Sequence, residues 1–227
     1  MAPATRAFRF YRGLEGKAYR EHCLNVPPDA YHLITKARSR KFQRHVPSDA
    51  SVFEYGLGCG FNLAALECRI KAGYDIAGPN PEINRAGIAF FHHPKEVADR
   101  SFDVIICHHV LEHVESPSHS LREMRRILLP QGLLLLNVPY EQERKWRRYD
   151  SKKTNRHLFS WNPQTLGTLV RTTGFEVESI ELKPFAYDRF AAIVTAWLGL
   201  NEIFYLSLRR ALQLLRPQYE ITGVFRK

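Results

Sequence analysis

The feature that constrains this chain most is a glycine-rich turn at residues 54–60, which reads Glu-Tyr-Gly-Leu-Gly-Cys-Gly. The turn follows an apolar run at 51–55 whose valine, phenylalanine and tyrosine favour an extended strand. Glycine lets the backbone turn tightly and lets a ligand approach the main chain closely. We expect a helix at 62–71 after the turn, with free N–H groups at its start. The pattern therefore predicts a strand, a ligand-binding turn and a helix in succession.

Strand-like and helix-like segments alternate after this turn. We expect strands at 51–55, 74–77, 88–91, 103–107, 133–138, 175–182 and 219–225, and helices at 62–71, 81–85, 121–129 and 163–173. The alternation over 51–138 predicts a doubly wound, mostly parallel α/β sheet, which binds ligands at the carboxyl ends of its strands. We expect a helical extension at 1–46 and one domain at 47–227, with a basic segment at 141–157 and a helical insertion at 184–217.

The net charge of +10 on 227 residues points to an anionic partner, such as a nucleic acid, a membrane surface or an acidic substrate. The four cysteines have neither zinc-site nor disulfide spacing, so we expect reduced thiols and a cytoplasmic protein. No apolar run follows the first arginines, and no stretch is long and apolar enough to span a membrane. We therefore predict neither a signal peptide nor a transmembrane helix.

The spacing of the glycines distinguishes between two kinds of cofactor site. A dinucleotide site requires G-x-G-x-x-G/A, and here Phe61 takes the third position, where it would crowd a pyrophosphate. The spacing G-x-G-x-G, with an acidic residue two positions earlier, resembles motif I of class I S-adenosylmethionine-dependent methyltransferases. In that family the loop faces the amino-acid and ribose parts of the cofactor. The resemblance implies that S-adenosylmethionine contacts Glu54, Gly56, Gly58 and Gly60.

Further segments resemble the same family in the same order. They lie at 102–114, 121–139 and 157–177, so that the resemblance covers about 50–182 and the terminal strand at 219–226. The pattern most resembles the small-molecule branch that includes ubiquinone-pathway and sugar methyltransferases. It implies a Rossmann-like, doubly wound, mostly parallel seven-stranded sheet with an antiparallel last strand and helices on both faces. It also implies methyl transfer to a small molecule by direct displacement.

Two positions depart from the family pattern. The family usually has an acidic residue at the end of the second strand, for the ribose hydroxyls, and here Gly78 or Asn80 takes that position. Asn80 would bind one hydroxyl with weaker, uncharged hydrogen bonds. The family tends to carry aspartate after the third strand, where this chain has His92 and His93. We expect His92 to contact adenine; the alternative is that the two histidines are exposed loop residues. These departures keep open a non-catalytic scaffold that has retained the fold.

Candidates for chemistry follow the fourth strand, where Cys107, His108 and His109 meet the expected cofactor. Methyl transfer needs alignment and exclusion of water, and it needs a base only when the nucleophile must lose a proton. We predict that His109 is this base, since imidazole titrates near neutral pH, and that Cys107 and His108 contact the cofactor. His109 and His113 have metal-ligand spacing, but no third ligand is evident, so we predict no metal and a structural His113.

The segment after the fifth strand is expected to bind the substrate. Tyr140, Arg144 and Arg148 combine aromatic rings with guanidinium groups, which bind phosphate and stack on rings. We therefore predict a small substrate that is anionic, lipid-like or sugar-like. The alternative is a nucleic-acid-binding protein or nucleic-acid methyltransferase that uses the same basic surface. Residues 191–216 mix apolar and arginine side chains, and they suit a peripheral membrane contact, packing on the sheet or a dimer contact.

Overall fold

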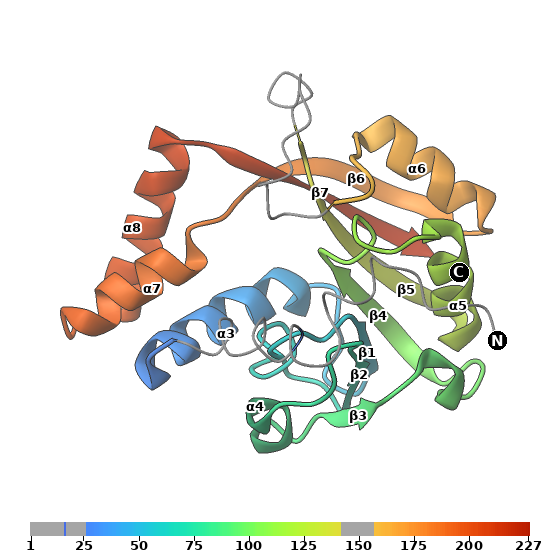
Figure 1. The fold of residues 1–227 in the computed structure, drawn as a ribbon, viewed down its shortest axis with the longest axis horizontal. Helices are drawn as coiled ribbons and strands as arrows, with labels where there is room; N and C mark the ends of the chain where they lie inside the picture. The colour runs from blue at the N-terminus through green and yellow to red at the C-terminus, as the bar shows by residue number, and fades with distance from the viewer. Residues whose placement is uncertain (1–15, 17–25, 142–156) are drawn as a thin grey trace.

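The computed structural model describes residues 26–141 and 157–227, together with Gly16. Seven strands form one sheet, with helices on both faces (Figure 1). The strands are β1 (Ser51–Tyr55), β2 (Ile70–Tyr74), β3 (Ala89–Phe91), β4 (Phe102–His108), β5 (Leu128–Pro139), β6 (Glu176–Phe185) and β7 (Gln218–Arg226). The helices are α3 (Pro28–Gln43), α4 (Pro81–Arg85), α5 (Pro117–Ile127), α6 (Pro163–Thr172), α7 (Asp188–Trp197) and α8 (Glu202–Leu215), with a 3-10 turn, η1, at Pro94–Glu96.

The strand order is β3-β2-β1-β4-β5-β7-β6. Strands β1 to β5 pair in parallel, and β7 is antiparallel to both of its neighbours. The chain runs outward from β1 through β2 to β3, then returns to build β4 and β5 on the other side. The carboxyl ends of β1 and β4 therefore form a topological switch point, where such sheets bind ligands. The predicted doubly wound sheet with an antiparallel last strand is confirmed.

The segment after the glycine turn differs from the prediction. Residues 61–65 form successive turns, and no α-helix occupies 62–71. Strand β2 begins at Ile70 and ends at Tyr74, so the strand predicted at 74–77 was placed about four residues too late. The reason is pairing with β1, whose register matches Ser51 to Ile70 and Tyr55 to Tyr74. These long-range hydrogen bonds override the local helical preference of the segment.

The remaining elements lie close to their predicted positions. Helix α5 starts before the predicted residue 121, because the Ser116 hydroxyl accepts a hydrogen bond from the His119 N–H at its first turn. Strand β5 is longer than predicted, since the expected turn around Pro130 and Gly132 is an irregularity within the strand, where its register against β4 shifts. These differences change element boundaries and leave the topology as predicted.

Side chains of the central strands alternate between two apolar layers. Leu134 and Leu136 of β5 pack with α5 and α6 on one face, and Leu135 packs on the opposite face. All five residues of β1 are buried, as expected for a strand covered on both sides. Burying one such leucine contributes roughly 1.5–3 kcal/mol, so these layers fix the strand ends that surround the site.

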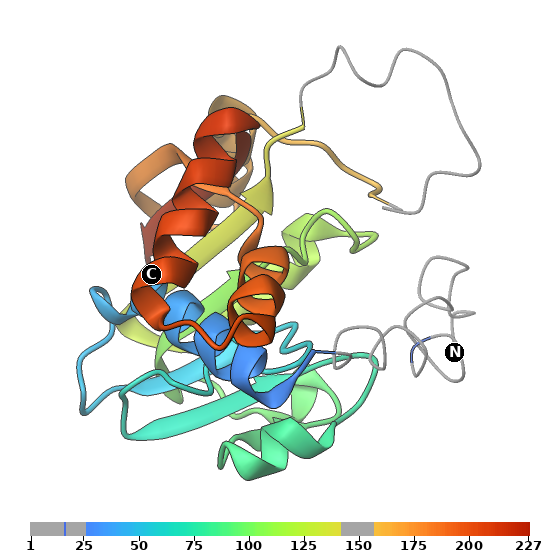
Figure 2. The ribbon, with the colours of Figure 1, turned by 90° about the vertical axis from the view of Figure 1, so that its left-hand side faces the viewer.

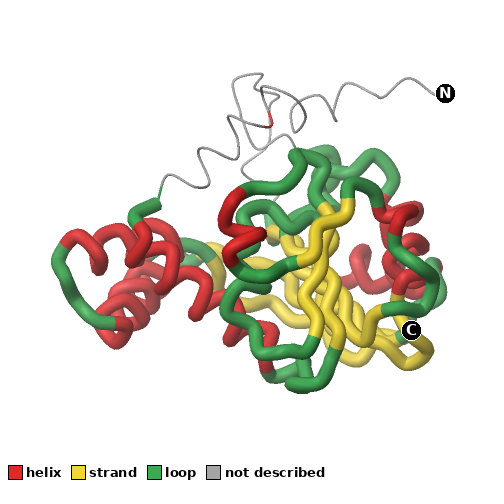
Figure 3. The backbone as a smooth tube through the Cα atoms, turned by 90° about the horizontal axis from the view of Figure 1, so that it is seen from below, coloured by secondary structure: helices red, strands yellow, loops and turns green. Residues whose placement is uncertain are grey.

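A third apolar cluster joins α3 to the α7–α8 pair. Ala30 and Ile34 of α3 pack against Ala191 and Ala192 of α7 and against Tyr205 of α8. The α7–α8 pair stands to one side of the sheet and lies beside α3 (Figures 2 and 3). Within the described part of the chain, every helix is too short or too polar to cross a bilayer.

Candidate active site

A cavity of about 620 Å³ opens at the carboxyl ends of β1, β2 and β4. Its walls are the glycine turn, the residues after β2, the residues after β4, the start of α5, and parts of α3 and α7. The volume suits a small molecule together with a cofactor-sized group. The cavity therefore lies at the switch point where the strand order predicts a ligand.

Two glycines of the turn have different structural roles. Gly56 has φ +88°, and a Cβ there would lie 2.2 Å from Cγ2 of Val110. Gly58 has φ +52°, but a Cβ there would meet no atom within 4 Å. Gly56 thus lets the turn pack against the segment after β4, whereas Gly58 borders open space that a ligand can fill. Gly60 does not line the cavity and lies near Ile83 and Ile88.

Glu54 brings a buried carboxyl group to the cavity wall. Its Oε1 accepts a hydrogen bond from the Asn62 amide, whereas its Oε2 is buried without a hydrogen-bond partner among the described residues. Burial raises the pKa of Glu54 to about 8, against the opposing effect of the Asn62 hydrogen bond. A ligand that brings an ammonium group would supply the partner that Oε2 lacks.

A second carboxylate stands where the sequence analysis expected none. Because β2 ends at Tyr74, Asp75 directly follows the strand and lines the cavity. Its Oδ2 accepts a hydrogen bond of 2.7 Å from the Gly58 N–H, and its Oδ1 accepts one of 2.8 Å from the Ala77 N–H. The expectation that Gly78 or Asn80 replaces the family's acidic residue was therefore wrong, because it rested on a misplaced second strand.

Asn80 and His92 lie elsewhere than the sequence analysis expected. Asn80 is buried as the N-cap of α4, where its side chain accepts hydrogen bonds from the helix and donates one to the Gly58 carbonyl. It supports the turn from outside the cavity lining. His92 is exposed and also lies outside the lining, whereas its neighbour His93 does line the cavity and caps η1.

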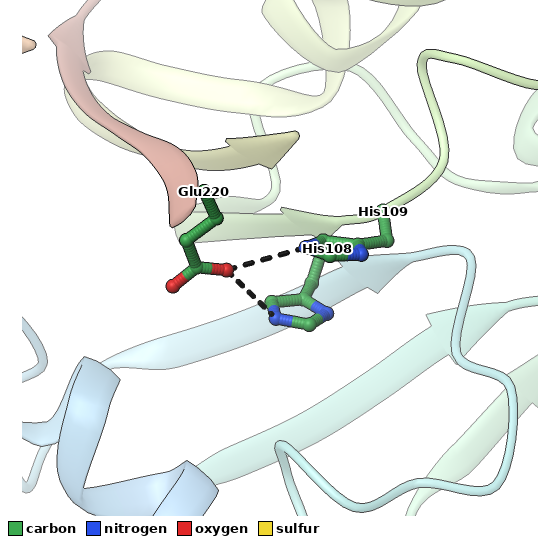
Figure 4. Close-up of side chains that lie close together, drawn as sticks. All are labelled: His108, His109 and Glu220. Atoms are coloured by element: carbon green, nitrogen blue, oxygen red, sulfur yellow. Dashed lines mark hydrogen bonds and ion pairs between the residues drawn. The ribbon is translucent and has the colours of Figure 1, made fainter. Parts of the chain in front are cut away.

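His109 follows β4 and carries a hydrogen-bonded carboxylate on one ring nitrogen (Figure 4). Its Nε2 lies 3.2 Å from Oε2 of Glu220 on β7, and Nε2 of His108 lies 3.6 Å from the same oxygen. The other oxygen of Glu220 forms an ion pair with Lys41 of α3. His109 has φ +56°, a strained conformation for a residue other than glycine, and its N–H donates to the Asn137 carbonyl.

Electrostatics set the protonation of this group. Burial alone would raise the pKa of Glu220, but Lys41 and the two histidines bring that pKa well below its usual range. Burial lowers the pKa of His109, although Glu220 opposes the shift, and burial followed by Lys41 lowers that of His108. Glu220 is thus an anion beside a neutral His109. With its Nε2–H donated to Glu220, His109 keeps Nδ1 as a proton acceptor.

Other predicted site residues lie away from this cavity or outside the description. Cys107 is fully buried in the core, and Tyr140 packs against the same core cluster without lining the cavity. Arg144 and Arg148 lie outside the described residues. Sequence reasoning missed Glu220, which is 111 positions from His109, although a glutamate within an apolar last strand is a detectable signal.

Comparison with known families matches residues 29–180 to the profile of a methyltransferase domain. The chain belongs to the class I S-adenosylmethionine-dependent methyltransferases. The matched region contains the glycine turn, Asp75 and His109, and it begins within the predicted N-terminal extension.

Relatives of this methyltransferase include two curated mammalian enzymes. A thiol S-methyltransferase of Mus musculus is 45% identical over 95 residues, covering 35% of this chain and 37% of the relative. A thiol S-methyltransferase of Rattus norvegicus is 30% identical over 105 residues, covering 38% of this chain and 41% of the relative. The matches therefore span about two fifths of the length of these relatives.

Solved structures of methyltransferases share the fold. A possible histamine N-methyltransferase from Thermotoga maritima superposes with a TM-score of 0.61, at 17% identity over 97% of each chain. A 1,6-didemethyltoxoflavin-N1-methyltransferase from Burkholderia thailandensis, solved with its substrate and S-adenosylhomocysteine, has a TM-score of 0.60. It is 16% identical, and the match covers 100% of this chain and 92% of that chain.

The cavity of this methyltransferase fits S-adenosylmethionine, the cofactor of the family. The unpartnered Oε2 of Glu54 suits the cofactor's ammonium group. We expect the Asp75 carboxylate to accept hydrogen bonds from the two ribose hydroxyls. Asp75 lines the cavity beside the Gly58 N–H, which donates to its Oδ2. The open space at Gly58 admits the cofactor close to the main chain.

Proposed function

We propose that this methyltransferase transfers a methyl group from S-adenosylmethionine to a small molecule whose nucleophile carries an ionisable proton. One observation carries the proposal: a single cavity brings together Glu54, with its unpartnered carboxylate oxygen, and His109, hydrogen-bonded to Glu220. The first group suits the cofactor's cation, and the second suits removal of a proton from the substrate. A scaffold without chemistry would need neither arrangement.

His109 and Glu220 act as a base and its stabilising anion in this proposal. When bound, the cofactor supplies an electrophilic methyl carbon on a positively charged sulfur. His109 would take the nucleophile's proton on Nδ1 while the new bond to the methyl carbon forms and the methyl–sulfur bond breaks, which leaves S-adenosylhomocysteine. The Glu220 carboxylate then stabilises the resulting imidazolium and holds the ring in place.

The remaining cavity wall indicates the class of substrate. Lys95 and Arg189 bring positive charge to the lining, as does Arg38, which is ion-paired with Asp188, and the carboxyls of Glu115 and Glu123 lie at the same wall. Phe61 and Phe185 bring aromatic rings. This combination suits a small anionic molecule with an apolar or aromatic part. The matched relatives are thiol S-methyltransferases, so a thiol is the nucleophile that we would test first.

The test measures S-adenosylhomocysteine formed with a panel of thiols, phenols and carboxylates, each in an anionic and an uncharged version. We expect turnover with an anionic member and, for a nucleophile that is protonated at the assay pH, a rate lowered about 10²–10⁴-fold in His109→Gln. Calorimetric binding of the cofactor should be unchanged in this variant. Cofactor binding without product from any class, or an unchanged rate in His109→Gln, would contradict the proposal.

We further propose that the outer face of the α7–α8 pair rests on an anionic membrane surface. Trp197, Ile203 and Leu214 are 83%, 73% and 73% exposed, and Ile203 and Leu214 share one side of α8 with basic Arg210. Apolar side chains with cations suit the interface of an anionic bilayer. Arg189 of α7 lines the cavity, so a lipid-like substrate would meet the site from this side.

Vesicle binding tests this membrane contact. We expect the chain to co-sediment with phosphatidylcholine vesicles that contain about one third phosphatidylserine, and less with phosphatidylcholine alone. Trp197 emission should shift to shorter wavelength on binding, and the double variant Ile203→Ser, Leu214→Ser should lose both signals. Sedimentation of neither vesicle would refute the contact. Concentration-dependent dimerisation that the same variant abolishes would instead assign the face to a second copy.

The two alternatives from the sequence have less support. Residues 144–156, the basis of the nucleic-acid hypothesis, lie outside the described part of the chain. Salt-dependent binding to generic oligonucleotides would favour that hypothesis. The non-catalytic scaffold was motivated by a missing carboxylate after the second strand, and Asp75 removes that motivation.

A further inference from the structure

Three titratable side chains that the proposed methyl transfer does not use converge beyond the end of β4. One ligand atom from each of Glu112, His113 and His157 lies within 4.8 Å of the other two. The Leu158 N–H donates a 2.7 Å hydrogen bond to the Glu112 carbonyl, which draws the segment before α6 onto the segment after β4. Backbone pairing therefore holds the cluster together across the sequence.

Glu112 is the unusual member of this cluster. Its side chain is fully buried, and among the described residues no side-chain donor reaches either carboxylate oxygen; the one donor near it is its own backbone N–H. The basic side-chain nitrogens nearest to Oε1 among the described residues are Nε2 of His113 at 3.9 Å and Nδ1 of His109 at 4.0 Å. A buried carboxylate in this setting requires a compensating cation or a proton.

His157 has the environment of a metal-ligating histidine. Its Nδ1 lies 2.9 Å from Oε1 of Glu141, so that a proton on Nδ1 leaves a lone pair on Nε2. A carboxylate on one ring nitrogen commonly orients the other nitrogen toward a metal ion. The rings of His113 and His157 are 4.8 Å apart at an interplanar angle of 74°. Two imidazoles thus approach one buried carboxylate.

We propose that Glu112, His113 and His157 bind a zinc ion, with Glu141 orienting His157. Two histidines and one glutamate form a ligand set of catalytic zinc, which leaves a fourth position open. Zinc at its usual ligand distances holds ligand atoms about 3.4 Å apart, so the cluster would contract by about 1 Å. The ion's two positive charges would compensate Glu112 and Glu141.

A second group of the same composition does not qualify. His108, His109 and Glu220 also place ligand atoms within 4.8 Å of one another. However, Lys41 forms an ion pair with Glu220, and its ammonium group would repel a divalent cation. The neighbouring charge therefore distinguishes the two clusters: the one with Lys41 suits proton transfer, and the one with Glu112 suits a metal ion.

The position of the zinc site connects it to the proposed function. His113 also lines the cavity, so the ion would lie at the cavity wall. The open coordination position would accept the oxygen or sulfur of a substrate and favour loss of its proton. This connection rests on the proposed methyl transfer, whereas the zinc site itself does not.

Direct metal binding tests the proposal. The full chain is stripped with a chelator and titrated with zinc chloride by calorimetry, and with cobalt(II) by visible absorption. We expect one zinc ion per chain and the intense absorption of four-coordinate cobalt. Glu112→Gln and His157→Ala should each weaken zinc binding at least tenfold, and Glu141→Gln by about 10–100-fold.

Two controls keep the outcome decisive. His119→Ala removes an exposed histidine of the same region outside the cluster and should bind zinc like the unmodified chain. If Glu112→Gln fails to fold, the half-buried His157 provides the deciding variant, with circular dichroism as the check. Absence of stoichiometric zinc binding, or equal binding by His157→Ala, would overturn the site. S-adenosylmethionine binding by the stripped protein separates that failure from failure of the proposed function.

Discussion

The pH dependence of cofactor binding should report on Glu54. With a pKa of about 8, this buried carboxyl is about nine-tenths protonated at pH 7 in the empty site. Only the ionised form pairs with the cofactor's ammonium group, so binding at pH 7 requires loss of one proton. The dissociation constant should fall by up to about tenfold per pH unit, or about 24-fold from pH 6 to pH 7.5.

Calorimetry in two buffers of different ionisation enthalpy measures both the affinity and the released proton. Glu54→Gln should bind more weakly at pH 7.5 and show no pH dependence over this range. Glu115→Gln, which changes an exposed carboxyl at the cavity edge, is the matched control and should keep the slope. A flat profile for the unmodified chain, or the same slope in Glu54→Gln, would refute the assigned role of Glu54.

The same group links stability to pH when the site is empty. The pKa of Glu54 is raised in the folded state, so folding favours its protonated form. Its contribution to stability is therefore full below the ordinary value of 4.5 and is lost as pH rises to about 8. Denaturant unfolding at pH 5 and pH 8 should show this loss, and Glu54→Gln should reduce it.

Three further predictions concern the cavity wall. Gly56→Ala should lower the free energy of unfolding, measured in urea, by about 2–4 kcal/mol, because φ is positive there and the new Cβ collides with Val110. Adding Val110→Ala should recover part of the lost free energy of unfolding. Gly58→Ala should cost only about 1 kcal/mol of stability, yet weaken calorimetric cofactor binding at least tenfold, because its Cβ enters the open space. Asp75→Asn should raise the cofactor dissociation constant about tenfold by removing charge-assisted hydrogen bonds; an unchanged value would place the ribose elsewhere.

Local sequence signals predicted the sheet because each central strand is an apolar run that must be buried on both faces. The glycine spacing likewise predicted the turn, since steric limits at Gly56 leave few alternatives. The second strand was misplaced because residues 70–77 contain two overlapping extended-like runs, and only the register with β1 chooses between them. That single error hid Asp75.

Long-range contacts account for the rest of what was missed. The partner of His109 comes from β7 and that of Glu220 from α3, and no local spacing reports such pairings. Glu112 was read as part of a family segment, and its isolation from hydrogen-bond donors depends on the packing of residues near 157. Buried polar groups of this kind become visible only when the tertiary structure defines their surroundings.

The placement of β7 has a consequence for the synthesis of this chain. Strand β7 follows β6 in the sequence but lies between β5 and β6 in the sheet. A ribosome-bound chain that has completed β6 therefore has the backbone groups of β5 unpaired on one side, at the edge of its most apolar strand. Such an edge pairs readily with other extended chains. Until β7 emerges, this edge of β5 is therefore open to pairing with another extended chain.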